Sequence, residues 1–414
     1  MRKFKLITRR ASVTALAALM AVGLGACNQG TDQTTTTAGD SAKTTTTTAA
    51  GSDSTDQTTT AAGTEETEAV TVEVTTVSDD TDTENTPTFT DRDMEQEADV
   101  SEATTLTVAD GEDVNITAEG VYVLSGTATE CQIIVDCADD AKVQLVLDNL
   151  NITNADSPAI YVKTAKKVFV TTTASSTNTL CCTGEFVTDG TTNTDAVIFS
   201  KEDLVLNGEG TLQVTSSDNG ITCKDDLKVT GGTYVISAQG DGLEANDLIA
   251  ICGGTFTINA DDAIHCSNDD DATLGALYIS GGLFDLTAQD DGLHAQTTVT
   301  IDGGEVSINA GEGIESTNIT FNDGTVSVTA SDDGINATDK SSAFSICITV
   351  NGGTVNVTTT TAKADAFDSK GDIIVTGGTV NITATSAFDF DGSSSLTGGE
   401  VYVNGTQITQ IKDA

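Results

Sequence analysis

The sequence predicts an all-β fold, a parallel β-helix whose coils of about 20–29 residues stack on one another. Three observations predict it. Pairs of glycines recur through the second half of the chain, short alternating strand patterns flank each pair, and the intervening segments leave no room for a crossover helix. Only 4% of the 414 residues are aromatic, too few for a conventional globular core, but a repeat protein can bury small β-branched residues between neighbouring coils.

The glycine pairs mark the repeat. They are Gly231-Gly232, Gly253-Gly254, Gly281-Gly282, Gly303-Gly304, Gly352-Gly353, Gly377-Gly378 and Gly398-Gly399. After a pair, apolar and polar residues alternate, as in Thr255–Ala260, and a second strand precedes the pair, as in Val299–Ile301. A leucine-rich repeat is the main alternative, but its Leu and Asn pattern is absent, and a β-propeller would need roughly 40 residues in each blade.

The N-terminus has the features of an export signal. Basic residues precede the apolar stretch Ala11–Leu24, which is too short for a comfortable membrane span and is followed by Gly25-Ala26-Cys27. Small residues before a cysteine resemble the bacterial lipobox, so we expect a lipoprotein signal peptide over residues 1–26 and a lipid anchor on Cys27. An ordinary signal peptide with an incidental cysteine is the alternative. The protein is expected at the outer face of the bacterial cytoplasmic membrane. Only its lipid anchor is expected to contact the membrane.

Two further regions follow the signal. Residues 27–100 are rich in Thr and lack apolar periodicity, so they are predicted to form a disordered linker. Residues 101–414 are the predicted β-helix domain, with irregular early coils over 101–200 and regular coils over 201–405.

The charge of the chain excludes some partners. There are 18 basic and 63 acidic residues, a net charge of -45. Such a body repels nucleic acid and attracts cations, so we expect no nucleic-acid partner. A solubilising surface would explain the charge most simply, and ordered metal sites are the sharper alternative.

The acids gather at one repeating turn, which follows each strand that a glycine pair opens. The pattern is an acid, a small residue, an apolar residue that enters the core, and a polar or acidic residue, as in Asp291-Gly292-Leu293-His294. Equivalent residues of adjacent coils lie about 4.8 Å apart, and calcium–oxygen distances are about 2.3–2.6 Å. Two stacked carboxylates can therefore share one Ca²⁺, and donor sets of oxygen alone argue against zinc. The candidate calcium ligands are Asp218, Asp241, Glu244, Asp261, Asp262, Asp290, Asp291, Glu312, Glu315, Asp332, Asp333, Asp365, Asp368 and Asp389.

Two alternatives qualify this prediction. The acids could instead cap the turns through their own backbone. His265 and His294 share one repeat position after the apolar residue, and they are the only histidines. Because no third ligand is evident in the sequence, we expect them to be outward turn residues and not a catalytic or zinc-binding pair.

The combined order of the motifs resembles a known family over about residues 103–405. The stretches that carry the resemblance are Val121–Gly126, Gln132–Asp136, Val143–Asn151, Ala159–Val162, Ala196–Lys201 and the coils with Gly-Gly and Asp-Gly-Ile. They are similar to the calcium-binding parallel β-helix carbohydrate-binding domain-containing lipoproteins of clostridia. The resemblance implies a right-handed β-helix like that of certain pectate lyases, bound Ca²⁺, and binding of cellulose and acidic pectic sugars without lyase activity.

The chain departs from the family at one repeated position. Several members carry Lys or Arg just after the apolar turn residue, where this chain has Thr222, Glu244, His265, His294, Glu315 and Asn336. The departure weakens direct capture of uronic acids by cationic side chains. Capture through bridging Ca²⁺ remains open.

The function that we expect is that of a monomeric, calcium-stabilised cell-surface protein that binds plant polysaccharide, either acidic pectin (polygalacturonate) or cellulose, without catalytic residues. A calcium-dependent polysaccharide lyase is one alternative, with Lys224 or Lys201 as base. Acidic neighbours of these lysines, such as Asp225, favour the charged amine, the wrong direction for a base. A structural adhesin without a sugar site is the other alternative, because outward faces rich in Thr and Asn suit a solvated surface equally well.

Overall fold

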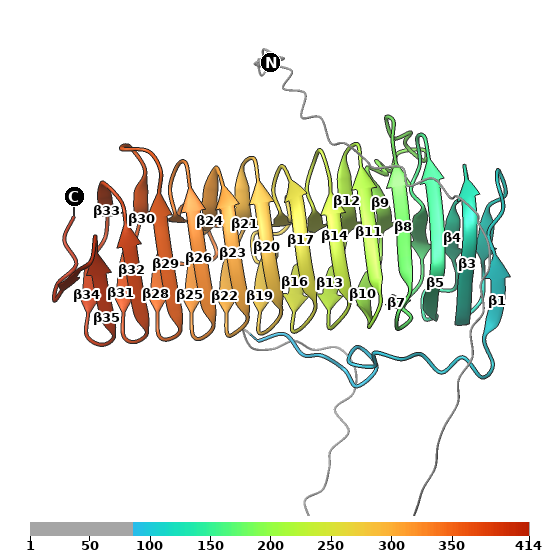
Figure 1. Ribbon diagram of the computed structural model, residues 1–414, viewed down its shortest axis with the longest axis horizontal. Coiled ribbons are helices and arrows are strands. Elements are labelled where there is room, and N and C mark those ends of the chain that lie inside the picture. Colours follow the sequence, from blue (N-terminus) through green and yellow to red (C-terminus); the bar gives the residue numbers. More distant parts are fainter. Residues whose placement is uncertain (1–85, 414) are drawn as a thin grey trace, which may run out of the picture. The chain divides into compact units, whose positions relative to one another are not determined.

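The computed structural model describes residues 86–413, which are drawn in colour in Figure 1. The predicted signal peptide, Cys27 and most of the predicted linker therefore lie outside the described residues. The described part consists of strands β1–β36 joined by turns and loops, and it contains no helix. Accordingly, this part of the chain has no helix with the length and apolarity of a membrane span.

Each regular coil contributes three short strands, one to each of three parallel rows, so the predicted parallel β-helix is confirmed (Figure 1). The 12-stranded sheet is one row and consists of β2 (Val114–Ile116), β4 (Ile133–Asp136), β6 (Ile160–Thr164), β9 (Ala196–Ser200), β12 (Asn219–Cys223), β15 (Leu243–Ala245), β18 (Ile264–Cys266), β21 (Asp291–Ala295), β24 (Glu312–Ser316), β27 (Ile335–Ala337), β30 (Asp365–Ser369) and β33 (Ser386–Phe390).

The 24-stranded sheet contains the other two rows, which meet in the long strands β3 (Gly120–Thr129) and β5 (Lys142–Asn154). The first row adds β1 (Thr104–Thr107), β7 (Lys167–Thr172), β10 (Asp203–Gly208), β13 (Asp226–Val229), β16 (Leu248–Ile251), β19 (Ala276–Ile279), β22 (Thr298–Ile301), β25 (Asn318–Phe321), β28 (Cys347–Val350), β31 (Asp372–Val375) and β34 (Ser394–Leu396). The second adds β8 (Thr177–Cys182), β11 (Thr211–Ser216), β14 (Thr233–Ser237), β17 (Thr255–Ala260), β20 (Leu283–Ala288), β23 (Glu305–Ala310), β26 (Thr325–Ala330), β29 (Thr354–Thr359), β32 (Thr379–Thr383), β35 (Glu400–Val403) and the antiparallel β36 (Thr406–Ile408).

The core lies inside the coils and is built from stacks of like side chains. The apolar turn residues form one such column, in which Leu243 pairs with Ile264 and Ile264 with Leu293. In the second row, the rings of Phe256 and Phe284 stack with centroids 4.6 Å apart. Because every coil buries the same positions against its neighbours, a modest supply of apolar residues suffices for a continuous core.

Glycine serves two different needs in each coil. The second glycine of a pair takes a positive φ, for example 110° at Gly254, where other residues are strained. In the acidic turn the need is space: a Cβ on Gly313 would lie 2.2 Å from the carbonyl oxygen of Gly334 on the next coil. The glycine pattern of the sequence thus has a conformational cause at one turn and a steric cause at the other.

The predicted linker ends earlier than expected. Residues 86–96, here called the strap, lie against the first row, although the sequence placed them in the disordered linker (Figure 1). Asp93 is completely buried, and its backbone oxygen accepts hydrogen bonds from Asn207 and Thr230. The Gln96 side chain accepts from the backbone N–H of Gly208 at 2.9 Å. Backbone and amide groups make these contacts, which explains why apolar periodicity did not reveal them.

Candidate functional site

The acidic turns form two polar columns along the 12-stranded sheet, here together called the ladder. The first column holds the residue after each apolar turn residue, and successive coils are in register: Thr222, Glu244, His265, His294, Glu315, Asn336, Asp368 and Asp389. The second column lies two residues before the apolar turn residue and contains Asp241, Asp262, Asp291, Glu312, Asp333 and Asp365. The structure thus brings ten of the fourteen predicted calcium ligands into the ladder. Asp218, Asp261, Asp290 and Asp332 instead lie exposed at its rim.

Carboxylates of the second column tie one coil to the next. Asp262 accepts the backbone N–H of Asp291 through Oδ1 at 2.8 Å, and Asp333 accepts that of Asp365 at 2.7 Å. These carboxylates therefore do cap backbone N–H groups, as the turn-capping alternative proposed. The capped N–H groups belong to the following coil and not to the turn of the carboxylate itself. One oxygen of such a carboxylate is used in this way, which leaves the other for the first column.

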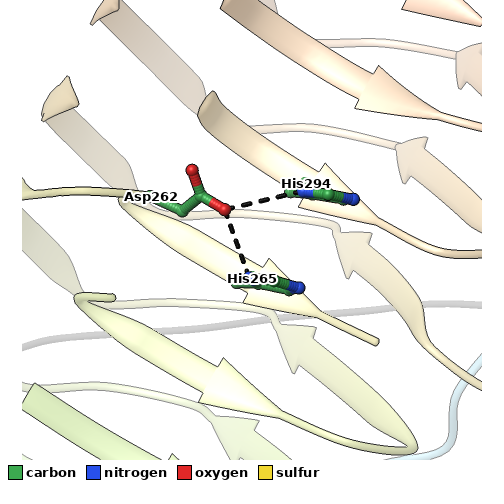
Figure 2. Close-up of side chains that lie close together, drawn as sticks. All are labelled: Asp262, His265 and His294. Atoms are coloured by element: carbon green, nitrogen blue, oxygen red, sulfur yellow. Dashed lines mark ion pairs between the residues drawn. The ribbon is translucent and has the colours of Figure 1, made fainter. Parts of the chain in front are cut away.

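The two histidines occupy the middle of the ladder (Figure 2). His265 Nδ1 lies 3.0 Å from Oδ2 of Asp241 and 3.2 Å from Oδ2 of Asp262. His294 Nδ1 lies 3.5 Å from the same Asp262 oxygen and 3.0 Å from Oδ2 of Asp291. Carboxylates only accept hydrogen bonds, so Nδ1 of each ring carries a proton. The third partner that the sequence did not reveal is thus Asp262, which lies between the two rings.

These contacts hold the imidazoles in their charged form. Burial alone would lower the pKa of His265, but hydrogen bonds to Asp241 and Asp262 outweigh burial and raise that pKa to about 10. The same balance, with Asp262 and Asp291 as partners, raises the pKa of His294 to about 9. Burial opposes ionisation of Asp262, yet its two histidine partners keep its pKa well below the ordinary value.

The histidine pair does not fit a metal ion held by both rings. Ligand atoms of Asp262, His265 and His294 lie within 4.8 Å of one another. However, the two rings are parallel to within 5° with centroids 4.5 Å apart. An imidazole nitrogen binds a metal in the plane of its ring at about 2.0–2.1 Å, and no single position lies in both planes. The imidazolium groups themselves supply the positive charge that the ladder needs here.

Other side chains balance the carboxylates on either side of the histidines. Lys224 donates to Oε1 of Glu244 at 3.0 Å, and Thr222 donates to its Oε2 at 2.7 Å. Lys340 forms an ion pair with Glu315 at 2.5 Å. Between Glu244 and Glu315 the carboxylates of the two columns therefore already have cationic or hydrogen-bonding partners.

Near the C-terminal end of the ladder, carboxylates lie close to other carboxylates and not to cationic side chains. Burial and the charges of Asp333 and Asp389 raise the pKa of Asp368 to about 6. Burial likewise raises the pKa of Asp333. A set of oxygen donors that repel one another in this way would suit a hard cation such as Ca²⁺.

A second acidic cluster, which the sequence analysis did not select, fits Ca²⁺ equally well. Carboxylate oxygens of Asp225, Asp226 and Asp247 lie within 4.8 Å of one another. Burial and the carboxylates of Asp203 and Asp247 raise the pKa of Asp225 to about 6. Burial and Asp203 raise the pKa of Asp226 to about 7. The signal was present in the sequence, because Asp225 and Asp247 each lie four residues after the apolar turn residue of their coil.

Two hollows adjoin this cluster and share Asp247. The polar hollow has a volume of about 680 Å³, and all the residues that line it are polar: Lys224, Asp225, Glu244, Asn246, Asp247, His265, Ser267, Asn268, Asp269 and Asp270. The mixed hollow, of about 420 Å³, includes Asp226 and Asp247 together with aromatic and aliphatic side chains. Both volumes fall in the range of small-molecule sites, about 300–1,000 Å³.

Comparison with known proteins identifies the family. The chain is 39% identical over 130 residues to a carbohydrate-binding domain-containing protein of Acetivibrio thermocellus, an alignment that covers 31% of this chain and 45% of that one, so the chain spans about half of this relative. A solved structure of a polysaccharide lyase-like protein from C. thermocellum, a gadolinium derivative, is 30% identical, with a TM-score of 0.49 over 51% of this chain and 93% of that chain. Residues 110–320 and 312–413 match the family of carbohydrate-binding domain-containing proteins, so the chain belongs to that family.

Proposed function

We propose that this chain is a cell-surface protein that binds acidic plant polysaccharide in the polar hollow, with Ca²⁺ held by the adjoining carboxylates. The observation that carries the proposal is the polar hollow itself, which adjoins the cluster of Asp225, Asp226 and Asp247. Membership of a carbohydrate-binding family supports a sugar as the ligand. The hollow offers hydrogen-bonding groups on every side, as a ligand rich in hydroxyl and carboxylate groups requires.

The chemistry of the cluster supports Ca²⁺ as the ion. Its donors are oxygens only, and burial together with neighbouring carboxylates raises the pKa values of Asp225 and Asp226, so a bound cation would relieve both effects. Bound there, Ca²⁺ would neutralise Asp225, Asp226 and Asp247 and offer its remaining coordination positions to a uronate carboxylate. Lys224 and His265 add positive charge on the wall of the same hollow.

Binding without catalysis agrees best with the groups at hand. The amine of Lys224 already donates to Glu244, and Lys201 is not among the residues that line either hollow. Among the described residues that line the polar hollow, no lysine other than Lys224 could act as the base that a lyase would use. Incubation with pectate and Ca²⁺ should release no unsaturated product that absorbs in the ultraviolet.

Retention on insoluble polysaccharide tests the proposal. The protein should be retained by polygalacturonate in Ca²⁺ and released by a chelator. The double variant Asp225→Asn/Asp247→Asn should lose this retention, whereas Asp290→Asn/Asp332→Asn, which removes the same charge from the exposed rim, should keep it. If the protein with Ca²⁺ is not retained by any plant polysaccharide, the proposal is wrong.

The surface location is part of the same proposal and rests on the sequence before residue 86. A lipid on Cys27 would hold the β-helix outside the cytoplasmic membrane at the end of the Thr-rich linker. Replacement of Cys27 by Ala should move the protein from the membrane fraction to the medium. Unchanged membrane association of that variant would refute the anchor.

A further inference from the structure

The mixed hollow combines features that the polar hollow lacks. It shares Asp247 with the polar hollow and is bordered by Tyr278 of β19, Thr298 of β22 and Phe344 of the loop between β27 and β28. Pro87 of the strap forms another part of its wall. Residues of the strap, of two adjacent coils and of a later loop therefore converge on one small space.

Two aromatic side chains line the mixed hollow. Tyr278 is 7% exposed, and its hydroxyl donates to Oδ2 of Asp302 at 2.8 Å, which fixes the ring and occupies the hydroxyl proton. Phe344 is half-buried and lines the same hollow. The fixed ring of Tyr278 has little conformational freedom left to lose on binding.

The strap wall is held in place from both sides. The carbonyl oxygen of Thr88, the residue after Pro87, accepts a hydrogen bond from Nζ of Lys228 at 3.0 Å. Further along, the side-chain nitrogen of Gln96 donates to Oγ1 of Thr230 at 3.2 Å. The hollow is thus formed before any ligand enters it.

Charge separates the two hollows. The residues that line the mixed hollow include two carboxylates, Asp226 and Asp247, and no Lys, Arg or His. The polar hollow, by contrast, has Lys224 and His265. Ca²⁺ bound by Asp226 and Asp247 would still leave these carboxylates lone pairs that accept from sugar hydroxyl groups in strong hydrogen bonds. A uronate carboxylate in the mixed hollow would find no cationic side chain to pair with.

We propose that the mixed hollow is a subsite for one neutral hexopyranose ring of the bound polysaccharide. The C–H face of the sugar packs on Tyr278 and Phe344, and its hydroxyl groups donate to Asp226 and exchange hydrogen bonds with Thr298. This inference rests on the proposed function for the class of ligand. Under this proposal the polysaccharide has a neutral segment in the mixed hollow and an acidic segment in the polar hollow, with Asp247 lining both.

Binding of defined oligosaccharides tests the subsite. The protein with Ca²⁺ is titrated calorimetrically with cellohexaose, with mannohexaose and with a galacturonic acid hexamer. Phe344→Ala should weaken binding of a neutral hexamer about tenfold, because it removes one aromatic contact, and should leave binding of the acidic hexamer within about twofold. Val187→Ala, an exposed apolar residue on another loop, should change neither.

The outcomes separate the two proposals. If neither neutral hexamer binds, or if Phe344→Ala binds it as tightly as the parent protein does, the neutral subsite is wrong, while binding of the acidic hexamer upholds the proposed function. If a neutral hexamer binds through Phe344 and the acidic one does not bind, the subsite stands and the acidic ligand is wrong. A melting temperature equal to that of the parent protein shows that Phe344→Ala is folded.

Discussion

Replacement of His265 by Gln tests whether imidazolium groups neutralise the middle of the ladder. Gln keeps a hydrogen-bond donor but cannot carry charge. A histidine whose pKa is about 10 in the folded protein and 6.5 when unfolded contributes at most about 4 kcal/mol at pH 7. The His265 side chain is 26% exposed and that of Asp241 19%, so solvent screening reduces the expected loss to about 2 kcal/mol.

The pH dependence of this loss is the sharper test. Because the folded pKa of His265 is raised, its stabilisation is fully present below pH 6.5 and disappears as the pH rises through about 10. Thermal melting with a chelator present should give His265→Gln a melting temperature about 3 °C below the parent at pH 6. The two melting temperatures should converge above pH 10.

A matched variant strengthens the assay. For His294→Gln the melting temperatures should converge about one pH unit lower, since the folded pKa of His294 is about 9. Comparison with the parent at each pH cancels the titration of groups that both proteins share. A deficit of equal size at pH 6 and pH 10.5 would refute the reasoning, because it would mean that His265 stabilises by ring stacking and not by charge.

Three further predictions concern the calcium cluster and the packing of the coils. Without Ca²⁺ the raised pKa of Asp226, about 7, makes stability fall as the pH rises from about 4 to 7. Asp226→Asn should therefore raise the melting temperature at pH 8 and reduce the stabilisation by added Ca²⁺. Gly313→Ala forces its Cβ against the Gly334 carbonyl oxygen and should cost about 3 kcal/mol in urea unfolding, whereas Gly111→Ala, with open space around the new Cβ, should cost about 1. Phe256→Ala empties the centre of a ring stack and should cost about 3–5 kcal/mol by the same measurement.

The fold could be predicted because the residues of each coil carry the same pattern of alternating apolar positions and glycine turns. A strand such as β17 alternates buried and exposed side chains, and the glycine pair before it fixes the turn. Stacking then repeats the same local solution along the chain. The strap escaped prediction because its contacts run through the buried Asp93 and the amide of Gln96, which carry no periodic signal.

The site could be predicted only in part. The sequence placed the acids of the ladder in one turn, but coils of unequal length hid which carboxylate faces which neighbour. Asp262 reaches His265 of its own coil and His294 of the next, so the third partner of the histidines depends on register and not on spacing. Asp247 was missed because the position four residues after the apolar turn residue is acidic in only some coils and is occupied by Asn268, Thr297 and Asn318 in the next three.

The partners along the ladder change what calcium would do in this chain. A bare stack of carboxylates at about 4.8 Å spacing would need a cation at almost every coil. Here Lys224, the two imidazoles and Lys340 pair with carboxylates over the stretch from Glu244 to Glu315, so this part depends less on a metal to hold its coils together. Carboxylates perturbed by burial and by like charges remain at Glu312, whose pKa rises to about 7, and in two clusters, one around Asp368 and one around Asp247. Of these two clusters, the one around Asp247 adjoins both hollows, so calcium there would act on the ligand as well as on the fold.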